Sequence, residues 1–546
     1  MQPWTDRTDD RPALAALLAD ALPGDRRTLI VGPHSLPLIS AVLDRTSDAT
    51  ILVRSVSDAE DLAAEFGDRL QVVAGALDGM ASGPFEVVVA ADGLDRVLGY
   101  DSGDLTWTER LQALTALAAP DAVVVLGLEN EFSLVNLLDS RPADERHGDD
   151  EWRPLHNDST RPVSVGQLES ALPWTAHIYA DFGSRTFVAA DVAAAARPGE
   201  LPTRLATDAL DASDVPLLSP VADGVDSAAR AGLLPAIPTG WIAIAGIRAA
   251  HDLYAQTGPA VLTADQVPDG WRTTIAASPA VDTTTPAFDA GVVPAEVPGG
   301  VSVESVLVRL AAAEDVPAFR KLAAELGEWA ADSRIVLRWD DVVIDGDTFA
   351  HGVSPWVTAE PTGKADLLAA AWYRFHDRLV GGHRRHPWPP WMVGDDLVST
   401  WMGMSGIELP ESVQATSPDT PSASVAHVAR GKELAAALAD VLRTRDDEAV
   451  DLRTALADAE QARQELLELK GHVFGLERTL GFRNKAMKTR ENRIRELRTQ
   501  LQKVTADHNR IRGSRTYAIS RVIFHAGQIR KPRVVARKLS RRLRKR

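Results

Sequence analysis

Two groups of polar residues in the N-terminal third of the chain could hold a ligand. The first follows an apolar run in the segment IVGPHSLPL, where Gly32, His34 and Ser35 stand between a predicted strand and a predicted helix. Glycine allows a ligand to approach the backbone, and the free N–H groups at a helix start favour anionic or nucleotide-like groups. Asp92, in VVVAADGLDRV, follows another apolar run. We expect both groups at one edge of a sheet, where open α/β sheets bind ligands.

Strands and helices that would position these residues alternate from Thr28 to about Ala190. The expected strands are short, β-branched and without polar alternation, as in a parallel sheet that is covered on both faces. They are Thr28–Val31, Thr50–Val53, Leu70–Val73, Phe85–Ala90, Ala122–Leu126, Ala176–Tyr179 and Thr186–Ala189. Helical periodicity is seen in Leu36–Leu43, Ser57–Phe66 and Thr108–Leu117. This alternation predicts a doubly wound α/β sheet. Asp95, Glu129, Asn130 and Glu131 would lie at the same rim as Asp92.

The segments LIVGPHSLP, FEVVVAADGLDRV and APDAVVVLGLENEFSL resemble three motifs of class I S-adenosylmethionine-dependent methyltransferases. The run ENEFSLVNLL and the later TRPVSVGQL are similar to actinobacterial methyltransferase-like proteins associated with cell-surface glycan genes. The resemblance covers about 20–195. It implies a Rossmann-like methyltransferase sheet and S-adenosyl-L-methionine bound at Gly32, His34 and Ser35, with Asp92 near the adenosyl group. In two respects the chain departs from the family: the second strand ends in Arg54 instead of an acidic residue, and the turn holds one glycine.

Methyl transfer from a sulfonium needs mainly positioning, with a general base where the acceptor must lose a proton. Such enzymes often place acceptor contacts in the loop after the fifth strand, here ERHGDDEWRPLHNDSTRP. We therefore predict His156 as the catalytic base and Asp158 as the residue that orients it. The alternative is that both make ordinary loop hydrogen bonds.

The second half of the chain divides by composition. Residues 196–300 are rich in Pro, Gly, Ala, Thr and Asp and are interpreted as a poorly defined connecting region, with a helix at Val225–Ala231 and a strand at Trp241–Ile247. Residues 301–410 hold seven of the thirteen tryptophans and are predicted to form an α+β domain. The polar segment 411–428 is predicted to be a linker.

Two polar clusters in the Trp-rich domain invite metal interpretations. RWDDVVIDGDTFAHGVSPW, with Asp341, Asp345 and Asp347, resembles the metal-binding strands of phosphotransferase-like proteins but lacks the Asn and the later acidic pair. A β-hairpin turning at Asp345-Gly346 explains the same residues without chemistry. The histidines His376, His383 and His386 lack a carboxylate at ligand spacing, so no metal site is predicted.

A long coiled coil is predicted over 429–510. Apolar residues occupy a and d positions in one heptad frame at Leu466, Leu469, Val473, Leu476, Leu480, Met487, Ile494, Leu497, Leu501 and Val504. This spacing indicates a left-handed supercoil and favours a parallel homodimer. Arg483 and Arg490 interrupt the d positions. The alternative is a single helix that folds back on the body of the protein.

Charge is divided unevenly between the body and the C-terminal tail. Residues 511–546 carry 13 basic and no acidic residues, which leaves 46 basic and 76 acidic residues in the rest of the chain, a net of −30. The tail also holds Tyr517, Ile519, Val522, Ile523 and Phe524, so we expect an amphipathic tail on anionic lipid. Its SRTYAISRV segment resembles the tails of bacterial glycosyltransferases. The acidic body disfavours nucleic acid as a partner.

The remaining features favour a cytoplasmic protein. There are no cysteines, no run of 18 apolar residues and no secretion-signal pattern in MQPWTDRTDDRP. Together with the resemblance, the sequence predicts a methyltransferase acting on a small-molecule or glycan acceptor, such as a lipid-linked sugar, at the inner face of the membrane. The competing hypothesis is a non-catalytic scaffold that uses a degenerate methyltransferase fold to organise envelope glycan enzymes.

Overall fold

The fold is described from a computed structural model of the 546-residue chain. It describes residues 5–6, 8–99, 102–139, 141, 158–213, 215, 217, 220–277, 286–381, 384–389, 392, 394–410 and 446–529. The chain separates into two compact units, Met1–Glu433 and Leu434–Arg546.

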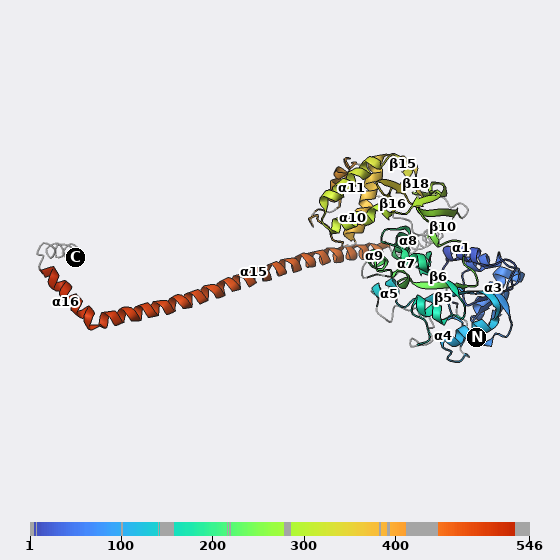
Figure 1. Cartoon of the computed structure of the whole chain (residues 1–546), viewed down its shortest axis with the longest axis horizontal. Coiled ribbons are helices and arrows are strands. Elements are labelled where there is room, and N and C mark those ends of the chain that lie inside the picture. The colour runs from blue at the N-terminus through green and yellow to red at the C-terminus, as the bar shows by residue number, and fades with distance from the viewer. Residues whose placement is uncertain are drawn as a thin grey trace. The chain divides into compact units, whose positions relative to one another are not determined.

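A twelve-stranded sheet organises the first unit (Figure 1), in the order β13-β11-β10-β9-β7-β6-β8-β5-β4-β1-β2-β3. Five strands pair in parallel: β3 (Gln71–Ala74), β2 (Ala49–Val53), β1 (Thr28–Val31), β4 (Phe85–Ala90) and β5 (Ala118–Glu129). β1 and β2 are buried along their whole length, as their unbroken apolar sequences predict. The strands and helices predicted between Thr28 and Ala190 are confirmed to within a few residues, and so is the doubly wound order of these five strands. The expectation of a parallel sheet is wrong for Ala176–Tyr179 and Thr186–Ala189, which pair in antiparallel fashion.

The other seven strands extend the sheet in antiparallel fashion from β5. They are β6 (Ala176–Phe182), β7 (Thr186–Ala189), β8 (Gly240–Ala245), β9 (Leu253–Thr257), β10 (Ala260–Val267), β11 (Gly270–Ala277) and β13 (Glu296–Pro298). Five of these come from 196–300, so the interpretation of that stretch as a poorly defined connection is wrong. β8 lies between β5 and β6 and shares their hydrophobic core, so the predicted methyltransferase-like domain, 1–195, does not end at residue 195.

Helices pack against this sheet and contribute to the same core. They are α1 (Pro12–Ala21), α2 (Leu36–Leu43), α3 (Val56–Phe66), α4 (Trp107–Leu117), α5 (Leu134–Leu138), α6 (Val165–Ala171), α7 (Ala190–Ala195), α8 (Leu201–Asp211) and α9 (Ala222–Arg230). The start of α4 is fixed by a capping box, in which Thr106 and Glu109 exchange hydrogen bonds with each other's backbone N–H groups. Its fully buried Trp107 anchors the helix in the core.

A second hydrophobic core belongs to the predicted Trp-rich α+β region. Its helices are α10 (Val303–Ala312), α11 (Val316–Trp329), α12 (Lys364–His376) and α13 (Asp395–Met404). Two small sheets accompany them, β12-β18-β15 (Ala287–Phe288, Trp356–Thr362, Ser333–Ile335) and β14-β16-β17 (Val301–Ser302, Val342–Asp345, Thr348–His351). Trp339, Trp372 and Trp401 are buried and stack edge to face or at a tilt, which explains the concentration of tryptophan.

The second unit contains the long helix α15 (Asp446–Gly513), followed by α16 (Arg515–Ile529) (Figure 1). The predicted heptad seam is exposed in the single chain; Leu469 is 67% exposed and Leu501 67%. The helix is therefore confirmed over the described residues, and its pairing with a second chain stays a prediction. The predicted linker and the start of the coiled coil lie outside the described residues. No helix among the described residues is long and apolar enough to cross a membrane.

Candidate functional site

The carboxyl ends of β1 and β4 form the switch point of the sheet. From β1 the strand order runs through β2 to β3 on one side, and through β4 to β5 on the other. Open α/β sheets bind ligands in a crevice at such a switch point. Gly32 follows β1 in the left-handed region, with φ +88°. The position of a Cβ atom there would lie 3.7 Å from Val97, an ordinary contact. Glycine is therefore required by the backbone conformation rather than by crowding.

His34 joins the segments that follow β1 and β4. Its Nδ1 lies 3.0 Å from the carbonyl oxygen of Gly32, and its Nε2 accepts a hydrogen bond of 3.2 Å from the backbone N–H of Ala91. Burial lowers the pKa of His34 although the Asp92 carboxylate opposes the shift. The ring is therefore neutral at pH 7, with its proton on Nδ1. The predicted cofactor-binding histidine thus holds the turn in place.

Ser35 precedes α2 as its N-cap residue, yet its hydroxyl does not cap the helix. The side chain is buried, and Oγ has no hydrogen-bond partner within the described parts of the chain. A buried hydroxyl without a partner costs roughly 1–3 kcal/mol. Its position at the start of α2 and beside the Gly32 turn makes it a natural contact for a polar ligand atom.

Asp92 follows β4 and is held by two arginines. Arg11 and Arg96 each place a guanidinium nitrogen 2.8 Å from one of its carboxylate oxygens. The Asp92 side chain is only 6% exposed. Arg11 comes from the segment immediately before α1, which the sequence interpretation did not connect with the site.

A second contact from the same N-terminal segment lies at the end of β2. Arg54, the residue found where the methyltransferase resemblance implies an acid, binds Asp6 through two hydrogen bonds of 2.6 and 2.8 Å. The backbone N–H of Asp6 also donates to Asp58, in the first turn of α3. The segment before α1 is therefore tied to the carboxyl ends of both β2 and β4.

The predicted rim residues gather around Arg161. Its guanidinium lies 3.3 Å from Asp95 and 3.3 Å from Glu131, and donates to the backbone oxygen of Glu129. Asn130 is fully buried and donates to the carbonyl oxygens of Ala236 and Pro238, which gives it a structural role. Arg161 was missed because its loop gives no periodic signal in the sequence.

Asp158 binds the start of α4. One carboxylate oxygen accepts from the backbone N–H of Trp107 at 2.5 Å, and the other accepts from the backbone and hydroxyl of Thr160. Burial alone would raise its pKa, but these hydrogen bonds outweigh it and hold the pKa of Asp158 below its usual value. His156 lies outside the described residues, so its pairing with Asp158 stays a prediction.

Asp181 at the end of β6 is a buried carboxyl group that sequence reasoning missed. β6 is antiparallel to β8, which is itself antiparallel to β5, so Asp181 lies at the same edge as Asp92. Burial raises the pKa of Asp181 to about 6, against the opposing influence of Arg11 and of the backbone N–H of Ser184. No sequence signal distinguishes it, because AHIYADFGS is an ordinary strand and turn.

Acidic and histidine residues of the Trp-rich domain that the sequence singled out make hydrogen bonds within the domain. The hairpin at Asp345-Gly346 is confirmed, with Asp345 opposite Thr348. The carboxylate of Asp341 accepts from the backbone N–H groups of Val353 and Ser354. His376 accepts from the N–H of Gly394, and His383 lies outside the described residues. Among described residues, no group of three or more His, Asp or Glu side chains is arranged to hold a metal ion.

Comparisons with known proteins give a likeness of fold only. No protein-family model matches the chain, and no curated protein matches it. Among solved structures, a methyltransferase from Burkholderia thailandensis, the 1,6-didemethyltoxoflavin-N1-methyltransferase with bound S-adenosylhomocysteine, is 21% identical. The match covers 22% of this chain and 52% of that one, with a TM-score of 0.18.

Two further solved structures give the same picture. An S-adenosylmethionine-dependent methyltransferase from Clostridium acetobutylicum is 11% identical over 24% of this chain and 56% of its own, with a TM-score of 0.20. The N-methyltransferase NodS from Bradyrhizobium japonicum, in complex with S-adenosylhomocysteine, is 12% identical over 22% and 59%, with a TM-score of 0.18. The chain thus spans little more than half of each solved protein. These scores are too low to transfer an activity, and the fold assignment rests on the strand order.

Proposed function

We propose that this chain is an S-adenosyl-L-methionine-dependent methyltransferase that binds its cofactor at the carboxyl ends of β1 and β4. One observation carries the proposal: the buried Ser35 hydroxyl lacks a partner among the described residues, at a helix start beside a left-handed glycine. A polar ligand in the crevice would supply the missing hydrogen bond. The resemblance of the surrounding segments to methyltransferase motifs gives the chemical class of that ligand.

The cofactor supplies an activated methyl group, and the residues around it have supporting roles. Gly32 lets the ligand approach the backbone, Ser35 binds a polar atom, and neutral His34 fixes the turn between Gly32 and Ala91. Asp92 is held in one orientation by Arg11 and Arg96. Since this arrangement is set before a ligand binds, little ordering is left to be done on binding.

For the acceptor, we propose a glycan or a lipid-linked sugar at the inner face of the membrane. The charge division of the chain supports this location, because an acidic body is repelled by anionic lipid and the basic tail is attracted to it. On α16, the apolar residues Ile519, Val522 and Ile523 are exposed. The exposed heptad seam of α15 supports a homodimer that would present two tails to one surface.

A specific observation favours a second candidate, a scaffold with a degenerate methyltransferase fold. Arg54 stands where an acid would bind the ribose hydroxyls, and it is neutralised by Asp6 rather than by a ligand. Arg11, from the same segment, donates a hydrogen bond to one carboxylate oxygen of Asp92. Both contacts use groups at the crevice that a cofactor would otherwise meet.

Calorimetric titration of the full chain with S-adenosylhomocysteine separates the two candidates. The methyltransferase proposal predicts saturable binding that weakens roughly five- to tenfold in Ser35→Ala, the effect of one lost hydrogen bond. Ser170→Ala, in the exposed part of α6, is the control and should bind as the natural chain does. Absence of binding at millimolar ligand would favour the scaffold.

A further inference from the structure

A pocket away from the proposed cofactor site lies between the large sheet and the Trp-rich core. It has a volume of about 160 Å³. One wall comes from the β6–β7 turn, α8 and the β9–β10 turn, and the other from the loops and helix of 338–378. Five arginines line it against three aspartates: Arg185, Arg204, Arg338, Arg374 and Arg378 against Asp208, Asp211 and Asp341.

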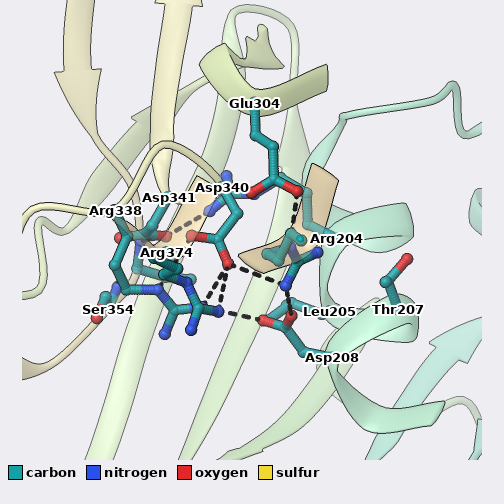
Figure 2. Close-up of polar contacts among 12 residues, drawn as sticks. Arg204, Leu205, Thr207, Asp208, Glu304, Arg338, Asp340, Asp341, Ser354 and Arg374 are labelled. Atoms are coloured by element: carbon teal, nitrogen blue, oxygen red, sulfur yellow. Dashed lines mark hydrogen bonds and ion pairs between the residues drawn. The ribbon is translucent and has the colours of Figure 1, made fainter. Parts of the chain in front are cut away.

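Acidic side chains hold these guanidinium groups in fixed orientations. Asp340 binds Arg338 through both carboxylate oxygens, at 2.5 and 3.1 Å, and accepts from Arg374 at 3.0 Å (Figure 2). Arg378 binds Glu304 at 2.7 Å. The arrangement holds Asp340 ionised, because the pKa of that carboxyl is well below its usual value: the three arginines outweigh the cost of its burial.

Arg204 completes the pocket by crossing from α8 to the opposite wall. It forms an ion pair with Asp341, whose carboxylate also accepts from the N–H groups of Val353 and Ser354 at 2.9 Å. This close approach requires Gly352, since a Cβ atom there would lie 2.4 Å from the Asp341 carboxylate and 2.9 Å from the Arg204 guanidinium. Gly352 therefore allows Arg204 to reach Asp341.

Buried polar atoms of the pocket lining lack a hydrogen-bond partner within the described residues. Among them are Nε of Arg204 and Oγ of Ser354, two residues that line the pocket (Figure 2). The Arg204 side chain is only 10% exposed. A guanidinium N–H and a hydroxyl that lie beside further arginines match the oxygens of an anion such as a phosphate group.

We propose that this pocket binds the phosphate group of a small phosphorylated sugar. The pre-oriented guanidinium groups would take the phosphate, with Arg204 Nε and Ser354 Oγ donating to its oxygens. Trp356, buried against Phe288, forms an apolar part of the wall, and Gln256 and Thr186 offer polar groups for sugar hydroxyls. The unpartnered Nε–H of Arg204 and the Ser354 hydroxyl, with further guanidinium groups beside them, favour the oxygens of a phosphate group over a neutral sugar.

Calorimetry with glucose 1-phosphate on the full chain tests the proposal, with glucose and inorganic phosphate as comparison ligands. We expect glucose 1-phosphate to bind more tightly than inorganic phosphate, and glucose not to bind. Two variants remove the unpartnered atoms while keeping the neighbouring contacts: Arg204→Lys retains the charge beside Asp341, and Ser354→Ala retains the backbone N–H. Each should weaken binding of glucose 1-phosphate roughly tenfold. Arg385→Lys, in an exposed ion pair with Glu314, should leave it unchanged.

Several results would overturn the proposal. The first is that glucose 1-phosphate does not bind at concentrations up to about 10 mM. The second is that inorganic phosphate binds as tightly as glucose 1-phosphate. The third is that both pocket variants bind glucose 1-phosphate with unchanged affinity. Thermal unfolding of each variant shows whether it is folded. If Arg204→Lys does not fold, Ser354→Ala still tests the proposal. The Ser354 hydroxyl makes no hydrogen bond within the described structure, so its removal should leave the fold intact.

Discussion

Arg54 and Asp6 form a buried, two-point ion pair that ties the carboxyl end of β2 to the segment ahead of α1. Arg54 Nη2 lies 2.6 Å from Asp6 Oδ1, and Nε lies 2.8 Å from Oδ2. The two side chains are 3% and 2% exposed. The N-terminal segment is therefore part of the structure around the proposed cofactor crevice, together with Arg11 and its partner Asp92.

Substituting Asp6 should destabilise the first unit strongly. Asp6→Ala removes the carboxylate that forms two hydrogen bonds with the buried Arg54, and breaking such a buried pair costs about 3–5 kcal/mol. Asp44→Ala breaks an ion pair with Arg69 in which the side chains are 74% and 59% exposed, and should cost less than about 1 kcal/mol. Urea unfolding of both variants measures the difference. Equal losses would show that the Asp6–Arg54 pair is not a structural tie.

The buried His34 predicts a loss of stability in acid. Burial lowers the pKa of His34, so the unfolded chain takes up a proton at a higher pH than the folded one does. Stability should therefore fall as the pH drops below about 6.5, the unfolded value. Thermal unfolding at pH 7.5 and 5.5 should show a smaller acid-induced loss in His34→Gln than in the natural chain. His472→Gln, on exposed α15, is the control, and an identical loss in all three would contradict the assignment.

The parallel half of the sheet could be predicted because its strands carry a strong local signal. Few folds other than a doubly wound sheet fit an alternation of β-branched runs and amphipathic helices. The predicted bounds of the strand Thr28–Val31 and the helix Leu36–Leu43 therefore match the structure. In the antiparallel half, β6, β7 and β8 were predicted as strands, but β9, β10, β11 and β13 were missed for a physical reason. In β10, buried and partly buried residues alternate, and Thr, Asp and Gln stand among the apolar residues. This sequence gives a weak local strand signal, so β10 forms a strand because it pairs with β9 and β11.

The site was predictable only in part. Gly32 and Ser35 could be found because a turn between a strand and a helix is a local feature. The contacts of Arg11 with Asp92 and of Arg204 with Asp341 join residues that are 81 and 137 positions apart. Such pairs leave no periodic pattern in one sequence, since only the tertiary fold brings them together.

The exposed seam of α15 predicts a dimer that a single charge in the seam should disrupt. Leu469 occupies a d position and Leu467 lies outside the seam, yet both are exposed in the single chain, at 67% and 62%. Leu469→Glu should place like charges together at the helix interface, whereas Leu467→Glu should remain in solvent. Sedimentation equilibrium should find a dimer in the natural chain and in Leu467→Glu, and dissociation in Leu469→Glu. A monomeric natural chain would refute the coiled coil.

The basic tail predicts association with anionic vesicles that depends on both charge and apolar residues. Deletion of 511–546 should abolish flotation with vesicles that contain anionic lipid, and Ile523→Asp should weaken it. Raised salt should also weaken the association, because the electrostatic part is screened. Flotation of the truncated chain at the level of the intact one would contradict the membrane proposal.

Hydrogen–deuterium exchange with and without S-adenosylhomocysteine tests the central claim most directly, because it locates the ligand as well as detecting it. The account predicts slower exchange in peptides that cover 32–38 and 90–95, where the β1 turn and the start of α2 face the loop after β4. It also predicts that this protection is reduced in Ser35→Ala. Unchanged exchange in both segments at saturating ligand would contradict a cofactor site at this switch point.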